Sequence, residues 1–256
     1  MEITLKGKVA VVTGASSGIG LAVVRQFLEC GATGVIGVFR RQSDPPELVL
    51  CKQQFGDKLQ IVRGDVADEQ TAIAYTDAAL KSFGRLDILV SNAAVSIVKP
   101  IHEHTPQEWD DVFNSNVKAV YWGSRHVIPV MIQQGGGLFL ISGSISGEVG
   151  IPTQGAYGPS KGALHLMARQ MAVEYAKHRI RINVIACGTV DTPIVHASAT
   201  ASGDPEAYWD MLKRNHPIGR IASADEVASF YAYMASDRAS FFTGSILMMD
   251  GGFTAQ

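Results

Sequence analysis

Two residues stand out for their types and spacing: Tyr157 and Lys161, four positions apart at the start of an expected helix. Residues at i and i+4 share one face of a helix, so the two side chains should lie close together. A nearby ammonium group favours the phenolate and should lower the pKa of Tyr157 from about 10, which fits the tyrosine for acid/base chemistry. Ser144 lies thirteen residues upstream, after an expected strand, where its hydroxyl could hydrogen-bond a carbonyl or alkoxide oxygen.

A glycine-rich turn follows the first expected strand and leads into a helix. Glycines let the backbone turn tightly and approach a pyrophosphate, while the helix N-terminus supplies free N–H groups. The spacing is Gly-x3-Gly-x-Gly, not the more common Gly-x-Gly-x2-Gly. The predicted contacts are Gly14, Ser16, Ser17, Gly18, Ile19 and Gly20.

Arg40, twenty residues after Gly20, indicates which dinucleotide would bind. In NAD sites an acidic residue at about this distance binds the 2′-hydroxyl of the ribose, whereas an arginine accommodates a 2′-phosphate. No acid lies between Glu29 and Asp44. A guanidinium pairs bidentately with phosphate, so the sequence favours NADP(H) over NAD(H). The neighbouring Arg41 is interpreted as a solvated surface charge.

Seven short apolar runs alternate with helix-length segments along the chain. Apolar runs without polar alternation are typical of parallel strands covered on both faces. We therefore expect an α/β fold: a single doubly wound Rossmann-type domain over residues 1–256, with a seven-stranded, mostly parallel sheet flanked by helices on both faces. The expected strands are 9–12, 35–39, 59–62, 86–90, 138–141, 180–185 and 246–248. The expected helices lie near 19–30, 68–83, 106–133, 156–178 and 223–236, with another after the turn at 43–46.

Several helix boundaries carry their own signals. Capping-box spacing predicts helix starts at Thr105 and Ser223. Pro159 is tolerated only in a first turn, which places the start of that helix very near Tyr157. The segment 194–204 is rich in Ala, Ser and Thr and is predicted to be a mobile loop, with helix resuming at Pro205. We expect a substrate loop or lid near 190–215.

The bulk composition narrows the function classes. The chain is 46% hydrophobic and 18% charged with a net charge of −2, which gives no nucleic-acid footprint. Three scattered cysteines form neither a disulfide framework nor a zinc pattern. No signal peptide or membrane-length apolar run is seen, so a cytoplasmic protein without membrane contact is expected. We interpret 102–104 (His-Glu-His) as a solvated loop and expect no metal.

These motifs occur in one order with consistent spacing, although each alone is weak. In that combination the chain resembles the short-chain dehydrogenase/reductase family, in its branch of about 250 residues. The resemblance extends from Lys8 to Phe253. It departs from the family pattern at Ala94, where a glycine is usual and the pocket near the nicotinamide would narrow. It also departs at Cys187, where a proline is usual and its absence affects local backbone rigidity.

The resemblance implies roles for particular residues. For catalysis it implies that Tyr157 donates and accepts the proton and that Ser144 orients the substrate. It implies that Lys161 lowers the pKa of the tyrosine and binds the nicotinamide ribose. It also implies that Asn116 holds a water molecule in a proton relay. For the cofactor it implies the turn glycines, Asp65 and Val66 at the adenine, Asn92 beside the adenine ribose, and Gly188, Val190 and Thr192 at the nicotinamide carboxamide and pyrophosphate.

The expected reaction is reversible hydride transfer between the nicotinamide C4 and a small-molecule carbonyl or secondary alcohol. The uncharged segment 194–203, with Val95, Ile97 and Val149, indicates an apolar pocket for a ketone, keto-ester, steroid-like or 3-oxoacyl substrate. An NAD-dependent alcohol, polyol or sugar dehydrogenase and a non-catalytic NADP(H) sensor remain open. His196 and His216 are predicted at the surface, and Trp209 and Met211 fit either a lid or ordinary packing. The resemblance also implies a homo-oligomer, with a tetramer favoured over a dimer and subunit contacts near the C-terminus.

Overall fold

Short runs of Val, Ile and Leu form a seven-stranded sheet in the order β3-β2-β1-β4-β5-β6-β9. The computed structural model describes residues 3–40 and 42–256. All six strand pairings in this sheet are parallel, so the expected doubly wound sheet is confirmed. The strands are β1 (Val9–Thr13), β2 (Gly34–Phe39), β3 (Leu59–Arg63), β4 (Ile88–Ser91), β5 (Gly137–Ser142), β6 (Ile180–Cys187) and β9 (Ile246–Met249).

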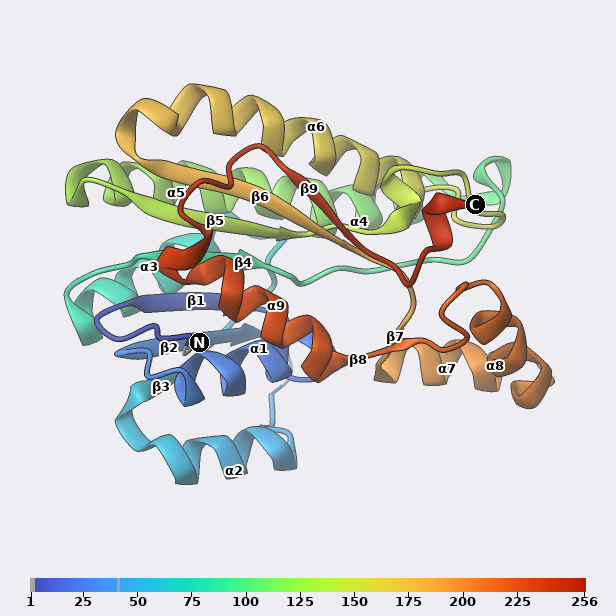
Figure 1. Ribbon diagram of the computed structural model, residues 1–256, viewed down its shortest axis with the longest axis horizontal. Coiled ribbons are helices and arrows are strands. Elements are labelled where there is room, and N and C mark those ends of the chain that lie inside the picture. Colours follow the sequence, from blue (N-terminus) through green and yellow to red (C-terminus); the bar gives the residue numbers. More distant parts are fainter. Residues whose placement is uncertain (1–2, 41) are drawn as a thin grey trace.

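Helices cover both faces of the sheet (Figure 1). Side chains alternate along each strand, so Ala10 and Val12 of β1 join one apolar core while Val9 and Val11 join the other. The first core packs against α1 (Gly18–Glu29), α2 (Pro46–Phe55) and α9 (Ala224–Ala235). The second packs against α3 (Glu69–Phe83), α5 (Ala119–Gln134) and α6 (Tyr157–Tyr175).

Several helix boundaries follow the sequence signals. The Thr105 hydroxyl accepts a hydrogen bond from the Glu108 N–H at the start of α4 (Pro106–Phe113), and both halves of this capping box are present. The same box forms between Ser223 and Glu226 at α9. Helix α6 begins at Tyr157, the position that Pro159 predicts. The single helix expected over 106–133 is instead α4 and α5 joined by a π-helical turn, Asn114–Lys118.

The segment after β6 differs from the prediction. The mobile loop expected over 194–204 is wrong, because α7 spans Pro193–Ala201 and Asp204 caps α8 (Pro205–Arg214). Pro193 starts α7 at a position where its missing N–H costs little. A two-stranded parallel pair, β7 (Val190–Asp191) with β8 (Ala222–Ser223), closes the base of this excursion. Figure 1 shows α7 and α8 projecting beside the carboxyl ends of the strands.

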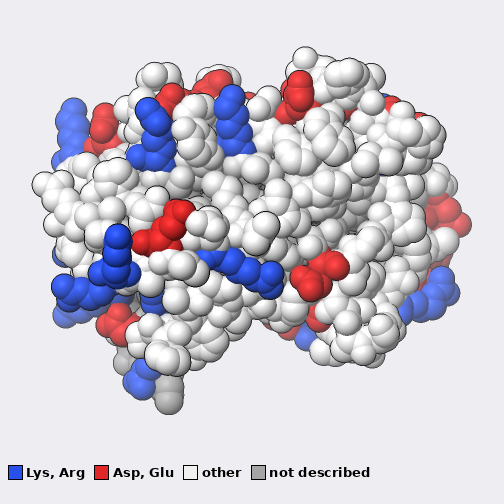
Figure 2. Space-filling view, turned by 90° about the horizontal axis from the view of Figure 1, so that it is seen from above, with Lys and Arg blue, Asp and Glu red and all other residues white. Residues whose placement is uncertain are grey.

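The outer surface carries charges of both signs. Figure 2 shows Lys and Arg side chains interspersed with Asp and Glu on the face that it presents, part of which is largely uncharged. Within residues 3–40 and 42–256, no helix combines the length and the apolar character that crossing a membrane requires.

Candidate active site

A cleft of about 870 Å³ opens where the carboxyl ends of the central strands meet. The strand order reverses between β1 and β4, which is the point where open α/β sheets bind ligands. All of the predicted site residues except Gly20 and Asn116 line this cleft. Those lining it are Gly14, Ser16, Ser17, Gly18, Ile19, Arg40, Asp65, Val66, Asn92, Ser144, Tyr157, Lys161, Gly188, Val190 and Thr192.

The glycine turn adopts a backbone conformation that would be strained if the glycines were replaced by other residues. Gly14 and Gly18 have φ angles of 71° and 54°, in the left-handed region. A Cβ at Gly14 would come within 2.7 Å of Asn92 Nδ2. At Gly20 a Cβ would collide with the Gly14 carbonyl oxygen. Gly20 therefore allows α1 to pack against the turn, although it does not line the cleft.

The N-terminus of α1 faces the cleft behind this turn. Its first turn carries no acidic side chain, and the Ser17 hydroxyl at the N-cap makes no capping hydrogen bond. Free N–H groups and the positive end of the helix dipole attract anions. This glycine cradle, which a Cβ would fill, fits the pyrophosphate of a dinucleotide.

Arg40 and Asp65 lie together in the cleft, at the ends of β2 and β3. The guanidinium Nη1 of Arg40 donates to Asp65 Oδ2 over 3.2 Å, and the Arg40 side chain is 66% exposed. The second carboxylate oxygen of Asp65 accepts a hydrogen bond from the Ala67 N–H. The bond from Arg40 to Asp65 uses one of the five guanidinium N–H groups, which leaves donors for a phosphate group. Arg41, predicted as a surface charge, lies outside the described residues.

Asn92 joins several elements at the switch point. Its Nδ2 donates to the Thr13 carbonyl oxygen over 3.0 Å, which ties the end of β4 to β1. Its Oδ1 accepts from the Ser142 hydroxyl over 3.1 Å, and that hydroxyl lies 2.6 Å from the Tyr231 hydroxyl on α9. The Asn92 amide thus fixes the floor of the cleft as well as lining it.

Ser144 and Tyr157 approach the cleft from a loop and a helix start. Ser144 follows β5 in extended backbone, and its Oγ accepts from the Ser146 N–H and lies 3.1 Å from Ser146 Oγ. Tyr157 is the first residue of α6. Burial raises the pKa of Tyr157 to about 12, which its interaction with the Ser144 hydroxyl partly opposes. The predicted lowering of the Tyr157 pKa is therefore wrong for this structure.

Lys161 lies one helical turn beyond Tyr157, as expected. Its Nζ donates to the Ser142 carbonyl oxygen over 2.7 Å and lies 5.4 Å from the centroid of the Tyr157 ring. Burial lowers the pKa of Lys161 to about 8, because desolvation disfavours the charged ammonium. The lysine is thus close to the phenol, but its main bond in this structure is to the backbone of β5.

Asn116 lies in the π-helical turn and is 2% exposed. Its Oδ1 accepts from the Val95 N–H over 2.9 Å. Its Nδ2 donates to the Val95 carbonyl oxygen and to the Ser160 hydroxyl, each over 3.0 Å. The side chain therefore tethers the segment after β4 to α6, and its part in a proton relay stays a prediction.

The segment after β6 is held by His216, for which the predicted surface position is wrong. His216, expected at the surface, is 3% exposed. Its Nδ1 donates to the Leu212 carbonyl oxygen over 2.7 Å and its Nε2 accepts from the Thr189 N–H over 3.0 Å. A Cβ at Gly188 would come within 2.7 Å of the same Nε2. His216 therefore anchors this segment to α8.

The same segment also lies close to the glycine turn. A Cβ at Gly18 would come within 3.1 Å of Thr192 Cγ2. The Thr192 hydroxyl donates to the Val190 carbonyl oxygen over 3.2 Å. His196, further along, is exposed and lies 2.6 Å from Asp191, as expected for a surface histidine.

The apolar lining differs in part from the prediction. Val95 lines the cleft as expected, but Ile97 does not, and Val149 lines a neighbouring pocket. Met211, for which a lid and ordinary packing were both open, also lines the cleft. Trp209 stacks edge-on against His196 outside the lining. Ile194, Tyr208 and Leu212, which lie within the predicted 190–215 lid, also line the cleft. Further lining residues that sequence spacing did not indicate are Ser146, Ile151, Thr153 and Gln154. Their positions follow from loop and helix packing, for which the sequence carries no local motif.

No metal site is formed by the described residues. No group of three His, Cys, Asp or Glu side chains among them is arranged to hold an ion. His102 and Glu103 are exposed and 3.8 Å apart.

Comparisons with known proteins agree with this arrangement. A family model described as "Enoyl-(Acyl carrier protein) reductase" matches residues 14–254. The chain is 38% identical over 249 residues to a cis-4-hydroxycyclohexanecarboxylate dehydrogenase from Sinomonas cyclohexanicum, covering 97% of each chain. It is 35% identical to an NADP-dependent (R)-specific alcohol dehydrogenase from Lentilactobacillus kefiri, covering all of both.

A solved structure shows the same fold at similar identity. The L-sorbose reductase from Gluconobacter frateurii, complexed with NADPH and L-sorbose, matches with a TM-score of 0.94 and 32% identity over 100% of both chains. The resemblance drawn from the glycine turn, Tyr157 and Lys161 is thus confirmed along nearly the whole chain. The protein belongs to the short-chain dehydrogenase/reductase family of oxidoreductases.

Proposed function

We propose that this protein is an NADP(H)-dependent oxidoreductase that interconverts a carbonyl group and a secondary alcohol on a small molecule. The observation that carries the proposal is that Ser144, Tyr157 and Lys161 line one cleft with the glycine turn at Gly14–Gly20. Side chains able to bind and protonate a substrate oxygen therefore lie beside a glycine turn that suits a dinucleotide. The family membership of the chain supports the same reaction class.

The cofactor assignment rests on Arg40 and on the relatives. Arg40 supplies a guanidinium at the end of β2, where a carboxylate would repel a 2′-phosphate. A relative is described as NADP-dependent, and a structural neighbour is complexed with NADPH. When bound, the nicotinamide would supply or accept the hydride. NAD(H) is the less favoured alternative.

In the proposed reaction each of the four predicted catalytic side chains has its own role. The raised pKa keeps the Tyr157 phenol protonated at neutral pH, so it can donate its proton to a substrate oxygen. The Ser144 hydroxyl would hydrogen-bond that oxygen, a contribution of about 3 kcal/mol in comparable oxyanion sites. Lys161, with its pKa lowered to about 8, can exchange a proton near neutrality behind the tyrosine. We retain the proposal that Asn116 positions a water for this exchange.

Substrate binding would involve α7 and α8. Ile194 of α7 and Met211 and Leu212 of α8 line the cleft, together with Ile145 and Ile151 from the loop after β5. We propose that these helices act as the lid expected near 190–215. The apolar lining favours a ketone, including a 3-oxoacyl substrate, over a phosphorylated sugar.

We also propose that the protein is a homo-oligomer, with a tetramer favoured over a dimer. Leu166 and Val173 lie two turns apart on α6 and are 67% and 82% exposed. Phe241, before β9, is fully exposed. Exposed large apolar side chains on separate elements support more than one subunit contact.

Tyr157→Phe tests the proposed chemistry. The change removes the acidic hydroxyl and leaves the ring, so turnover should fall by at least about 100-fold, the smallest effect expected of a general acid. NADPH binding, measured by fluorescence titration, should change little. Turnover is followed by NADPH absorbance over a panel of carbonyl compounds.

Tyr121→Phe is the matched control, because Tyr121 is an exposed tyrosine outside the cleft. It should retain the activity of the unmodified protein. Unchanged turnover in Tyr157→Phe would refute the assignment of Tyr157. NADPH binding by the unmodified protein without turnover of any carbonyl compound would favour a cofactor sensor.

A further inference from the structure

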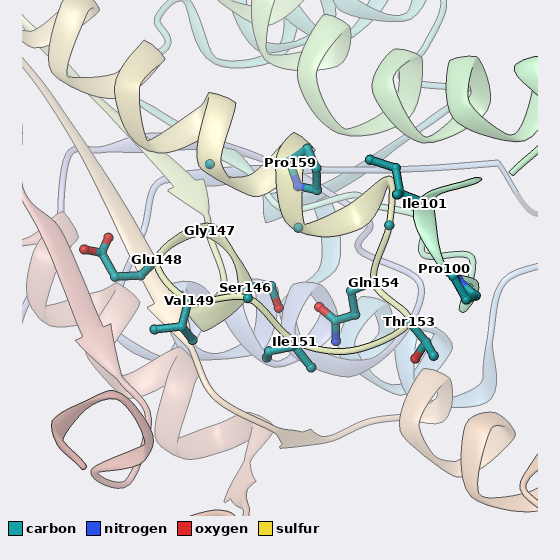
Figure 3. Close-up of a pocket in the computed structure, with 14 residues that line it drawn as sticks. Pro100, Ile101, Ser146, Gly147, Glu148, Val149, Ile151, Thr153, Gln154 and Pro159 are labelled. Atoms are coloured by element: carbon teal, nitrogen blue, oxygen red, sulfur yellow. The ribbon is translucent and has the colours of Figure 1, made fainter. Parts of the chain in front are cut away.

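A second pocket, of about 470 Å³, adjoins the main cleft on the side of the loop before α6. Figure 3 shows its lining, with Ser146 early in the connection between β5 and α6 and with Ile151, Thr153 and Gln154 later in the same connection. These four residues, Ser146, Ile151, Thr153 and Gln154, line both the pocket and the cleft. They therefore form the wall between the two cavities, which we call the shared wall.

The backbone of Gln154 is held firmly in this wall. Lys99 donates from its N–H to the Thr153 carbonyl oxygen over 2.7 Å and accepts from the Gly155 N–H over 3.1 Å, which forms a bridge around Gln154. The Gln154 carbonyl oxygen accepts from the Gly158 N–H over 2.9 Å and so leads into α6. The Gln154 side chain is thus presented from a fixed position three residues before Tyr157.

The side-chain oxygen of Gln154 is buried and has no hydrogen-bond partner among residues 3–40 and 42–256. Most buried polar groups are hydrogen-bonded, because leaving one unpaired is costly. By contrast, the side-chain amides of Asn92 and Asn116 have partners for both the oxygen and the nitrogen. In Figure 3 the Gln154 amide points toward Ser146, which lies earlier in the same connection.

We propose that Gln154 selects substrates that carry a hydroxyl group next to the reacting carbonyl, that is, α-hydroxyketones and the corresponding vicinal diols. The proposal rests on the reductase function proposed above. In this proposal Ser144 and Tyr157 hold the carbonyl oxygen, and the Gln154 side chain, which lines the same cleft, turns its amide so that Oε1 accepts a hydrogen bond from the adjacent hydroxyl. A simple ketone leaves this oxygen unpaired, and a site built to bind a hydroxyl discriminates against a substrate that lacks it.

The test measures a ratio: kcat/KM for 3-hydroxybutan-2-one divided by kcat/KM for butan-2-one, with NADPH. A second pair, 2-hydroxycyclohexanone and cyclohexanone, covers a cyclic substrate. In the unmodified protein both ratios should exceed about 10. Gln154→Leu should lower them about 10-fold or more, since it removes the acceptor. Gln154→Glu, which keeps an acceptor oxygen, should retain the preference, and Gln107→Leu on the exposed face of α4 should leave the ratios unchanged.

Two results would overturn the inference while leaving the reductase function intact. One is a preference of the unmodified protein for the simple ketone or for butane-2,3-dione, which carries no hydroxyl. The other is an equal loss in Gln154→Leu for both members of each pair. If the unmodified protein reduces no carbonyl compound with either cofactor, the proposed function fails, and the inference fails with it.

Discussion

At the scale of single residues, the proposed preference for NADP(H) depends on Arg40. In this structure its guanidinium donates through Nη1 to Asp65, and the side chain is 66% exposed, so further N–H donors can bind a 2′-phosphate. Hydrogen bonds to charged groups contribute about 1.5–3 kcal/mol, or roughly 10–100-fold in binding. We expect Arg40→Ala to raise the dissociation constant for NADPH by that factor and to change NADH binding far less. Fluorescence titration with each cofactor measures both values.

Arg25→Ala is the control, because Arg25 is paired with Asp225 and does not line the cleft. It should leave the binding of both cofactors unchanged. If Arg40→Ala weakened NADPH and NADH equally, Arg40 would not recognise the 2′-phosphate, and the case for NADP(H) would return to the relatives alone.

Single residues were predictable where a short motif fixes them. Tyr157 and Lys161 share a helix face, and the glycines after β1 precede a helix. Local spacing was therefore enough to predict that each set belongs to the site. The pKa of Tyr157 was not predictable, because the burial that raises it depends on the surrounding packing. His216 and Gln154 were missed for the same reason: their environments are made by elements distant in sequence.

At the scale of elements, the N-cap of α9 should contribute measurably to the free energy of unfolding. Ser223 accepts a hydrogen bond from the Glu226 N–H, and α9 packs in the same core as α1. Removing an N-cap hydroxyl typically costs about 1 kcal/mol. We expect Ser223→Ala to lower the free energy of unfolding by about that amount. Urea titration followed by circular dichroism measures the change.

Ser229→Ala in the middle of α9 provides the comparison. The Ser229 hydroxyl bonds only to the Asp225 carbonyl oxygen of its own helix, and alanine is the better helix former. This variant should be as stable as the unmodified protein or slightly more so. Equal destabilisation by both changes would show that the capping box does not carry the effect.

Elements with strong periodicity or caps were predictable, and those without them were not. The seven strands are short, mostly apolar runs, of which all but β3 and β9 are largely buried, and two helix starts carry capping boxes. Helix α7 was mistaken for a loop because its Ala, Ser and Thr residues give weak periodicity and only Ala199 is buried. The π-helical turn around Asn116 depends on tertiary hydrogen bonds to Val95 and Ser160, which spacing does not reveal.

At the scale of the whole molecule, His165 should make stability depend on pH. The ring lies under the Ser144 loop, where a Cβ at Gly147 would come within 2.7 Å of its Cε1. Burial lowers the pKa of His165, although Glu148, 3.6 Å away, acts in the opposite direction. Arg169 and Lys161 add to the lowering. The native histidine therefore stays neutral at a pH where the unfolded chain takes up a proton.

This difference fixes the sign of the effect. Below a pH of about 6.5 the unfolded state binds more protons, so the free energy of unfolding should fall as the pH is lowered. His165→Gln should reduce that slope between pH 7 and 5, measured by urea titration at each pH. His102→Gln, at a histidine whose side chain is 79% exposed, should keep the slope. A slope unchanged by His165→Gln would assign the acid sensitivity to other groups.

The assembly of the protein provides the last prediction. A tetramer with dihedral symmetry needs two different interfaces, and strongly exposed apolar residues lie on separate elements: Leu166 and Val173 on α6, and Phe241 before β9. Charged residues at the centre of such interfaces are strongly disfavoured. We expect a Leu166→Glu, Val173→Glu double variant and a Phe241→Glu variant each to halve the tetramer mass measured by light scattering. Leu50→Glu on α2, at a comparably exposed leucine, should leave the mass unchanged. A monomeric unmodified protein would refute the assembly, and a tetramer that survives both changes would place its interfaces elsewhere on the surface.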